Sequence, residues 1–141
     1  MAANAPVTDQ SEARPSRPLR ISAAPKVRQV YWCDFWLDAS PPEMTKKRPV
    51  VIVSYKNVLQ GHCLVLPMST NEQTGDSAKW AHKLSIKPDG VRHSWVICNH
   101  LYTVSTTRLE QIGGRVPRLG TEEFNAILGR MFDWLPTASD T

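Results

Sequence analysis

The sequence has few cysteines, no long apolar run and little net charge beyond its first residues, and each of these absences excludes a class of protein. No run of about 18 or more apolar residues occurs, so no segment is expected to span a membrane. The first residues lack the apolar stretch of a secretory signal. Cys33, Cys63 and Cys98 each lie inside an apolar run, so we expect buried, reduced thiols of a cytoplasmic protein and no disulfide framework.

The net charge of +4 is concentrated near the N-terminus. Residues 1–28 hold five basic and two acidic side chains, which gives +3, whereas the remainder holds twelve basic and eleven acidic ones, which gives +1. The basic isoelectric point therefore does not by itself indicate a nucleic-acid-binding face. Such a face must come from local clustering of charge.

The composition changes near residue 28. Residues 1–27 are rich in Pro, Ala, Ser and Arg and show almost no apolar periodicity, so they are predicted to form a flexible arm, an inert extension rather than a basic nucleic-acid arm. Residues 28–136 are predicted to form a single domain, followed by a short tail over residues 137–141.

Apolar runs punctuated by Pro, Gly and polar clusters predict five strands in this domain. The run PVVIVSY is typical of a strand buried on both faces, and the alternation in residues 80–86 is typical of a half-buried edge strand. The expected strands span residues 29–37, 49–55, 62–68, 80–86 and 94–104, the last being the longest.

One helix is predicted, over residues 121–135. Thr121 is the expected N-cap, and Pro136 ends the helix. One apolar stripe follows the helical period and contains Phe124, Ile127, Leu128, Met131 and Leu135. Short strands with a single terminal helix predict an α+β fold, a small antiparallel β-barrel with a C-terminal helix.

A basic side chain at the start of one strand and hydroxyls at the end of the next indicate a phosphate-binding site. If residues 49–55 and 62–68 pair as a hairpin, Arg48 lies on the same rim of the sheet as Ser69 and Thr70. A permanent cation beside two hydroxyl donors is suited to binding phosphate. Lys47 and Asn71, which neighbour these residues in sequence, are expected to bind the substrate as well.

The order of these segments resembles the PemK/MazF family of toxins from type II toxin–antitoxin modules. The matching pieces are KKRPVVIVS, LPMST, SWVICNHLYTVSTTRLEQIGG and the terminal helix, over about residues 28–135. The resemblance implies an SH3-like barrel, usually dimeric. It also implies a metal-independent endoribonuclease that needs no cofactor, cuts single-stranded RNA such as mRNA, and is blocked by a cognate antitoxin.

The resemblance also implies roles for single residues. Arg48 matches the family's active-site arginine, and Thr70, with Ser69 beside it, matches the hydroxyl position. Many members carry Gly-His-Glu before the Arg-Pro pair, and here residues 41–43 read Pro-Pro-Glu, which keeps Glu43. Some members carry a catalytic Arg-x-Asp in the long strand, and here residues 97–99 read Ile-Cys-Asn, so both charges are absent.

Metal-free RNA cleavage needs a base for the 2′-hydroxyl proton, a cation for the phosphorane charge and an acid for the leaving oxygen. Arg48 suits the cation role. Glu43 and His100 are the candidates for proton transfer, with a packed strand histidine as the alternative for His100. Asn99 retains hydrogen-bonding groups for RNA. The spacing of His93, Cys98 and His100 matches no zinc pattern, so no metal is expected.

Aromatic side chains in the predicted strands can stack on bases if they are exposed, but in a small barrel they more often fill the core, so one or two at most are expected to touch RNA. They are Tyr31, Trp32, Trp36, Trp80, Trp95 and Tyr102.

Two other functions stay open. The first is a non-catalytic RNA- or protein-binding module, favoured by Ile97 and Asn99 in place of the charged pair. The second follows a related toxin of this superfold that poisons DNA gyrase by binding protein. That function requires residues 131–135 of the helix to be free, and it does not require Arg48 and Thr70 to face a common groove.

Overall fold

The computed structural model describes residues 17–36 and 39–140. The strands are β1 (Val30–Asp34), β2 (Lys47–Ile52), β3 (His62–Ser69), β4 (Ala81–Lys83), β5 (Trp95–Ile97), β6 (Tyr102–Ser105) and β7 (Leu109–Glu110). The helices are α2 (Thr121–Trp134) and three short 3₁₀ segments, η1 (Gly75–Trp80), η2 (Thr106–Arg108) and η3 (Ala138–Asp140). Among these described helices, none is long and apolar enough to span a bilayer.

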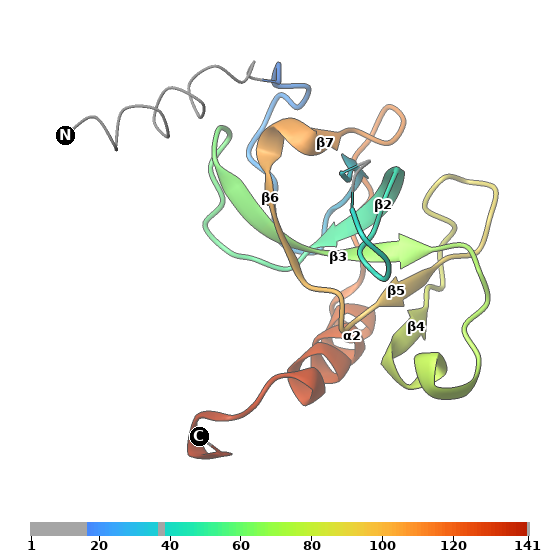
Figure 1. Cartoon of the computed structure of the whole chain (residues 1–141). Coiled ribbons are helices and arrows are strands. Elements are labelled where there is room, and N and C mark those ends of the chain that lie inside the picture. The colour runs from blue at the N-terminus through green and yellow to red at the C-terminus, as the bar shows by residue number, and fades with distance from the viewer. Residues whose placement is uncertain (1–16, 37–38, 141) are drawn as a thin grey trace.

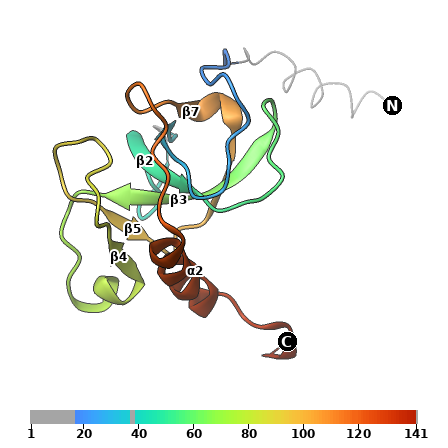
Figure 2. The same ribbon diagram turned by 180° about the vertical axis from the view of Figure 1, so that it is seen from behind.

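Strand β3 is the centre of the sheet (Figure 1). One edge of β3 pairs with β2, and the other pairs with both β6 and β5, always antiparallel. The strand order is β4-β5-β3-β2-β1-β7. Helix α2 lies against the side of the sheet that faces the viewer in Figure 2. This confirms the predicted α+β fold, a small antiparallel barrel-like sheet with a C-terminal helix, although the sheet does not close.

The hairpin of β2 and β3 is confirmed, with Val50 opposite Pro67 and Ile52 opposite Val65. Both faces of β2 are buried, as its run of β-branched residues predicted. Val50 and Ile52 belong to the cluster inside the curved sheet, whereas Val51 belongs to the cluster that α2 covers. Two cores on opposite faces of β2 therefore hold the second half of this strand in place, directly after Arg48 and Pro49.

Helix α2 covers one face of the sheet with Phe124, Ile127 and Met131, all of them buried. The prediction of Thr121 as the N-cap is wrong: Gly120 occupies that position, and no side chain caps the helix. Leu135 lies beyond the helix end and is 40% exposed, because the chain leaves the sheet there.

The single strand predicted over residues 94–104 is wrong, because the segment forms two strands. Val96 is paired with Met68, and Tyr102 with Val65. The chain thus advances six positions along this segment while β3 spans three, so extra residues bulge out between β5 and β6. Pro67 lies opposite this bulge and has no N–H to donate to a ladder. The bulge carries Asn99 and His100.

The edge strand predicted over residues 80–86 is shorter than expected. Only residues 81–83 pair, and Ile86, placed on the apolar face by the alternation, is 38% exposed. The backbone N–H of Leu84 donates to the carbonyl of Ser94, and that of Ser85 donates to Glu123 of α2. These contacts turn the chain out of the sheet after Lys83.

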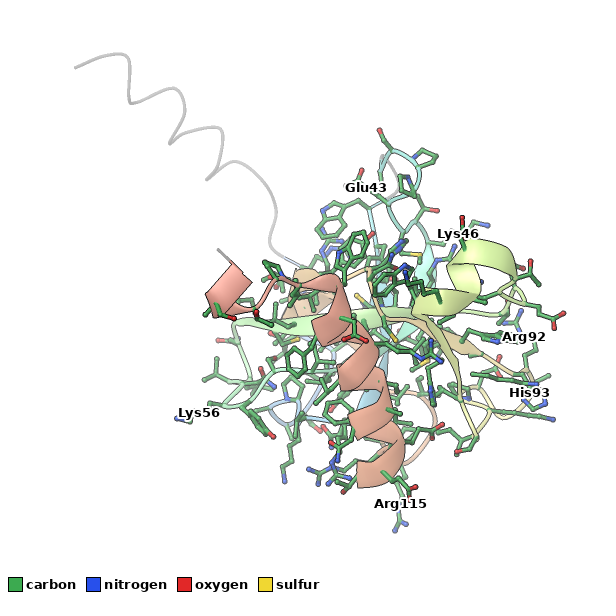
Figure 3. All side chains as sticks on the ribbon, turned by 90° about the horizontal axis from the view of Figure 1, so that it is seen from below. Glu43, Lys46, Lys56, Arg92, His93 and Arg115 are labelled. Atoms are coloured by element: carbon green, nitrogen blue, oxygen red, sulfur yellow. The ribbon has the colours of Figure 1, made fainter. Side chains whose placement is uncertain are left out.

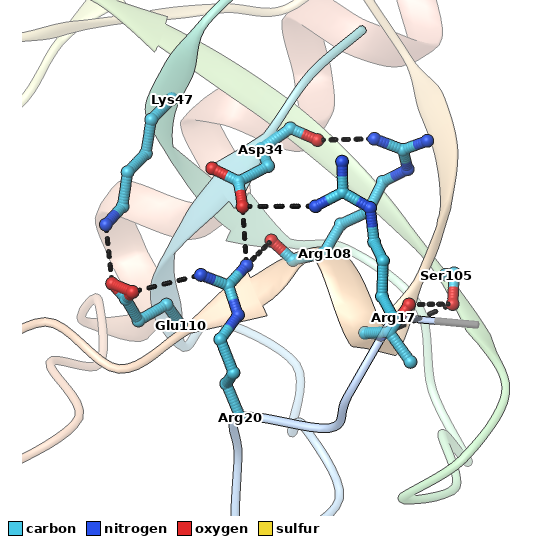
Figure 4. Close-up of polar contacts among 8 residues, drawn as sticks. Arg17, Arg20, Asp34, Lys47, Ser105, Arg108 and Glu110 are labelled. Atoms are coloured by element: carbon cyan, nitrogen blue, oxygen red, sulfur yellow. Dashed lines mark hydrogen bonds and ion pairs between the residues drawn. The ribbon is translucent and has the colours of Figure 1, made fainter. Parts of the chain in front are cut away.

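The domain boundary predicted at residue 28 stays a prediction, but residues 17–27 contact the sheet. Ile21 is only 7% exposed. Arg20 pairs with Asp34 at 2.6 Å and with Glu110 at 3.1 Å (Figure 4). Composition did not reveal this contact, because its partners are distant in sequence. Residues 1–16 of the predicted arm lie outside the described residues.

The expectation of buried thiols is confirmed. All three cysteines are buried and free of disulfides. Burial raises the pKa of Cys33 to about 12, that of Cys63 to about 11 and that of Cys98 to about 12. The thiols are therefore protonated at neutral pH and are poor nucleophiles.

Candidate functional site

Arg48 lies between two clefts. Its Nε donates to the carbonyl of Thr45 at 3.0 Å, which orients the guanidinium, and no carboxylate of the described residues pairs with it. The inner cleft, about 260 Å³, is lined by Met44, Arg48, Ser69, Gln73, Ser77, Trp80, Ile97, Asn99 and His100. The outer cleft, about 280 Å³, is lined by Trp32, Lys46, Lys47, Arg48, Pro49, Met68, Thr70, Asn71 and Arg92.

The two hydroxyls predicted beside Arg48 lie on different sides of it. Continuing the β2–β3 register by two residues from Val50 and Pro67 places Ser69 opposite Arg48. Ser69 is buried and lines the inner cleft, and its Oγ accepts the N–H of Asn71 at 3.1 Å. Thr70 is exposed and lines the outer cleft, because successive side chains of an extended chain point in opposite directions. Arg48 therefore lines one cleft together with Ser69 and the other together with Thr70.

His100 reaches the inner cleft from the bulge between β5 and β6. Its N–H donates to the carbonyl of Ile97 at 3.2 Å, so the residue sits in a turn and not in a strand. The side-chain Nδ1 is buried without a partner among the described residues. Burial lowers the pKa of His100 below its ordinary 6.5, so the ring is neutral near pH 7 and able to accept a proton.

Asn99 and Ile97 line the same cleft. Ile97 is the last residue of β5 and is 8% exposed, whereas Asn99 is half-buried in the turn. The inner cleft thus contains one cation, one neutral imidazole, hydroxyls and amides. Among the residues the structure describes, no carboxylate lines it.

The outer cleft is cationic. Lys46, Lys47 and Arg92 surround it together with Arg48. Lys47 pairs with Glu110 and lies 5.7 Å from the centroid of the Trp32 ring. Lys46 has a left-handed backbone (φ 69°) at the start of β2.

Arg92 comes from the loop between β4 and β5, and its Nε lies 3.2 Å from a carboxylate oxygen of Asp89. The backbone N–H groups of Arg92 and Val91 hold the pKa of Asp89 below its usual value. Figure 3 shows Arg92 and Lys46 from different loops, and it shows Arg115 at the opposite end of the molecule from Glu43.

The structure does not bring Glu43 into either cleft around Arg48. Glu43 lines a third cleft with Trp36, Ala39 and Tyr102. Its Oε1 accepts the backbone N–H of Ser40 at 2.8 Å.

Several residues around Arg48 were not found from the sequence. Arg92 and Lys46 belong to loops, where no periodicity predicts which way a side chain points. Lys47, Thr70 and Asn71, which were predicted beside Arg48, line the outer cleft, and the run of three cations over residues 46–48 is the signal that could have added Lys46.

No group of three or more metal-ligating side chains occurs in the part of the chain that the structure describes. His93 is exposed, and His82 is bonded to Glu123 at 3.0 Å.

Comparison with known proteins identifies the family. The family model for the PemK-like, MazF-like toxin of type II toxin–antitoxin systems matches residues 26–132. The chain therefore belongs to this family. No curated protein sequence matches it.

Solved structures of the family share the fold. MazF from Deinococcus radiodurans superposes with a TM-score of 0.63 at 16% identity, covering 81% of this chain and 98% of that one. A mycobacterial endoribonuclease in complex with its cognate antitoxin gives 0.56 at 18%, covering 81% and 99%. Mycobacterium tuberculosis toxin MazF-mt6 gives 0.52 at 17%, covering 76% and 95%. At these identities the likeness shows the fold.

Proposed function

We propose that this protein is a toxin endoribonuclease that cleaves single-stranded RNA, including mRNA, without a metal ion. The observation that carries the proposal is the position of Arg48, which has no carboxylate partner among the described residues and stands between a cationic cleft and a nearly neutral one. An RNA strand has one phosphate per nucleotide, so it can place one phosphate at Arg48 and the next in the outer cleft. Membership of the toxin family supports this reading.

The proposed reaction is an internal transesterification. The 2′-hydroxyl gives its proton to a base, its oxygen bonds to the adjacent phosphorus, and the bond from phosphorus to the 5′-oxygen breaks. The leaving oxygen takes up a proton, so the products end in a 2′,3′-cyclic phosphate and a 5′-hydroxyl. Arg48 holds the charge of the phosphorane, and the Ser69 hydroxyl and the Asn99 amide position its oxygens.

Of the two proton-transfer candidates, His100 suits the base role better than Glu43. His100 lines the same cleft as Arg48, and its lowered pKa keeps it in the neutral form that accepts a proton. Glu43 lies in the third cleft and is bonded to its own loop. Thr70, Asn71 and Lys47 are proposed to hold the neighbouring phosphate in the outer cleft.

A cognate antitoxin is the proposed protein partner, and the active form is proposed to be a homodimer in the cytoplasm. The family is defined by such two-component modules, and one solved structure of similar fold is an endoribonuclease with its cognate antitoxin. The three free thiols are compatible with a reducing compartment.

A second candidate is a toxin that acts by binding protein, and one observation favours it. The end of α2 exposes large apolar side chains: Phe132 is 58% exposed, Trp134 is 53% exposed and Leu135 is 40% exposed. Exposed apolar patches of this kind mark interaction surfaces. This candidate predicts toxicity without RNA cleavage.

The test is incubation of the purified protein with a long single-stranded RNA in the presence of EDTA. Arg48→Ala is compared with Arg115→Ala, which removes an equal charge from an exposed position outside both clefts. The expected result is discrete fragments with 2′,3′-cyclic phosphate ends, produced by the wild type and by Arg115→Ala only. Intact RNA with retained toxicity would favour the protein-binding candidate.

A further inference from the structure

We propose that the third cleft, lined by Trp36, Ala39, Glu43 and Tyr102, is a nucleobase subsite that selects guanine in the RNA strand next to the cleaved phosphate. The proposal rests on the proposed RNA-cleaving function and adds a base preference to it. It also changes the role of Glu43, from a candidate for proton transfer to a residue that reads the substrate.

The walls of this cleft are aromatic. It has a volume of about 350 Å³. The rings of Trp36 and Tyr102 have centroids 6.4 Å apart and planes inclined by 32°, and Trp36 is 38% exposed. Phe35 packs edge-on against Tyr102 at 5.1 Å and supports it from the core. Exposed aromatic rings held in place in this way are the usual stacking surfaces for unpaired bases.

Trp36 is fixed before any ligand binds. The guanidinium carbon of Arg108 lies 4.3 Å from the centroid of the Trp36 ring. Arg108 is held in turn by the carbonyl of Asp34, at 2.9 Å, as Figure 4 shows. Because the cation already covers the ring, stacking a base elsewhere on it requires little further ordering of the side chain.

The third cleft and the inner cleft share a wall. The hydroxyl of Tyr102 accepts the backbone N–H of Met44 at 2.7 Å, and Met44 lines the inner cleft. Tyr102 also follows His100 by two residues, and Glu43 directly precedes Met44. A base in the third cleft therefore belongs to a nucleotide adjacent to the phosphate at Arg48.

Glu43 determines which base fits. An ionised carboxylate only accepts hydrogen bonds, and one of its oxygens already accepts the N–H of Ser40. Guanine presents two neighbouring donors, N1–H and the 2-amino group, on its Watson–Crick edge. Adenine and cytosine each present one amino group next to an acceptor nitrogen, and uracil presents one N–H between two carbonyls. Only guanine offers the carboxylate two adjacent donors.

The experiment is cleavage of an RNA library with randomised positions, followed by sequencing of the new ends. Glu43→Gln keeps an oxygen for the N–H of Ser40 but presents an amide to the base. The matched control is Glu122→Gln, an exposed glutamate on α2 that lines none of these clefts. The expected result is guanine enrichment at one fixed position beside the cut, reduced about 10-fold in Glu43→Gln and unchanged in the control.

Two results would overturn the proposal. One is the same base preference in the wild type and in Glu43→Gln. The other is an equal fall in cleavage at every site in Glu43→Gln, which would return Glu43 to a role in proton transfer.

A binding measurement separates this proposal from the proposed function. NMR titration with guanosine and cytidine 5′-monophosphate follows the indole signal of Trp36, assigned with Trp36→Phe. The subsite proposal is supported if guanosine monophosphate binds more tightly than cytidine monophosphate and Glu43→Gln loses this difference. That result supports the subsite even if RNA is not cut and the nuclease proposal is wrong. If RNA is cut and the two nucleotides do not differ, the subsite proposal is wrong and the nuclease stands. If RNA is not cut and the nucleotides do not differ, both proposals are wrong.

Discussion

The inner and outer clefts share Arg48 but differ in almost every other respect. The inner cleft is lined by a neutral imidazole, two amides, hydroxyls and apolar side chains, and two of its residues come from the bulge between β5 and β6. The outer cleft is lined by lysines and arginines from loops and by the exposed Thr70. The first has the groups that proton transfer needs, and the second has the charges that hold a polyanion.

This difference shows how one arginine can serve two purposes. In the outer cleft Arg48 is one of several cations, so the loss of a neighbour leaves the others in place. In the inner cleft it is the one permanently charged side chain among the described lining residues, so nothing there replaces it. Substitutions in the inner cleft should therefore have larger effects than those in the outer cleft, and they should lower the cleavage rate more than the RNA affinity.

The largest effect is expected from Arg48→Lys. An ammonium keeps the charge but lacks the planar fork that can donate to both clefts at once. We expect single-turnover cleavage to fall about 1000-fold while RNA affinity falls far less. Rapid-quench kinetics and a filter-binding assay measure the two separately. Equal losses in both would mean that Arg48 only binds RNA, and the contrast between the clefts would disappear.

The next largest effect is expected from His100→Gln, which should lower the cleavage rate about 100-fold at neutral pH. Burial lowers the pKa of His100 below 6.5, and the neutral ring is the form that accepts a proton. Wild-type cleavage should therefore be steady around pH 7 and fall as the pH drops below 6.5 through the lowered pKa. The variant should lose this dependence. A rate–pH profile with the same acid limb in both proteins would remove His100 from the reaction.

Glu123→Gln tests the support behind the inner cleft without reference to activity. Glu123 on α2 accepts hydrogen bonds from His82 and from the N–H and hydroxyl of Ser85, next to the segment that carries Trp80. Burial raises the pKa of Glu123, but these bonds outweigh that effect and leave it below 4.5. The stability that ionised Glu123 contributes to the folded protein is therefore fully present above the pKa of this side chain in the unfolded state. It is lost as the pH falls through the pKa in the folded state.

We expect Glu123→Gln to lower the free energy of unfolding by about 2 kcal/mol at pH 7. The difference from the wild type should narrow below about pH 4. Urea denaturation at several pH values measures it, with Glu122→Gln as the neighbouring exposed control. A constant difference at all pH values would show that packing, not ionisation, is responsible.

The smallest effect is expected from Arg92→Ala in the outer cleft. Arg92 is 61% exposed and shares its charge with Asp89, so its removal should weaken RNA binding about 3-fold. The slope of log affinity against log salt should become less steep by about 0.7, the value for one phosphate contact on a single strand. Titrations at several salt concentrations, with Arg115→Ala beside them, measure the slope. An unchanged slope would place Arg92 outside the RNA path.

The parts of the fold predicted from the sequence are those that local pattern determines. The β-branched run from Pro49 and the turn before His62 defined the hairpin, and antiparallel pairing then placed Arg48 beside Ser69 and Thr70. The apolar stripe of α2 followed in the same way. Each of these depends on residues close together in sequence or on a simple pairing rule.

What the sequence did not reveal depends on distant contacts. The split of the segment 94–104 arises from its pairing with two parts of β3, and within the segment only Asn99 is of a type depleted in strands. The contact of Arg20 with Asp34 and Glu110, and the arrival of Arg92 at the outer cleft, join segments far apart in the chain. Glu43 was predicted near Arg48 because the two are five positions apart, but the loop folds it toward Trp36.

The bulge between β5 and β6 has a consequence for how such proteins diverge. Because Asn99 and His100 have no paired positions on β3 and line a cleft, their side chains can be exchanged without altering the ladder that holds the sheet together. Selection can therefore change the residues at positions 99 and 100 at little cost to the pairing of the strands. The fold and the reacting groups are then inherited almost independently, and relatives with one architecture can differ in chemistry.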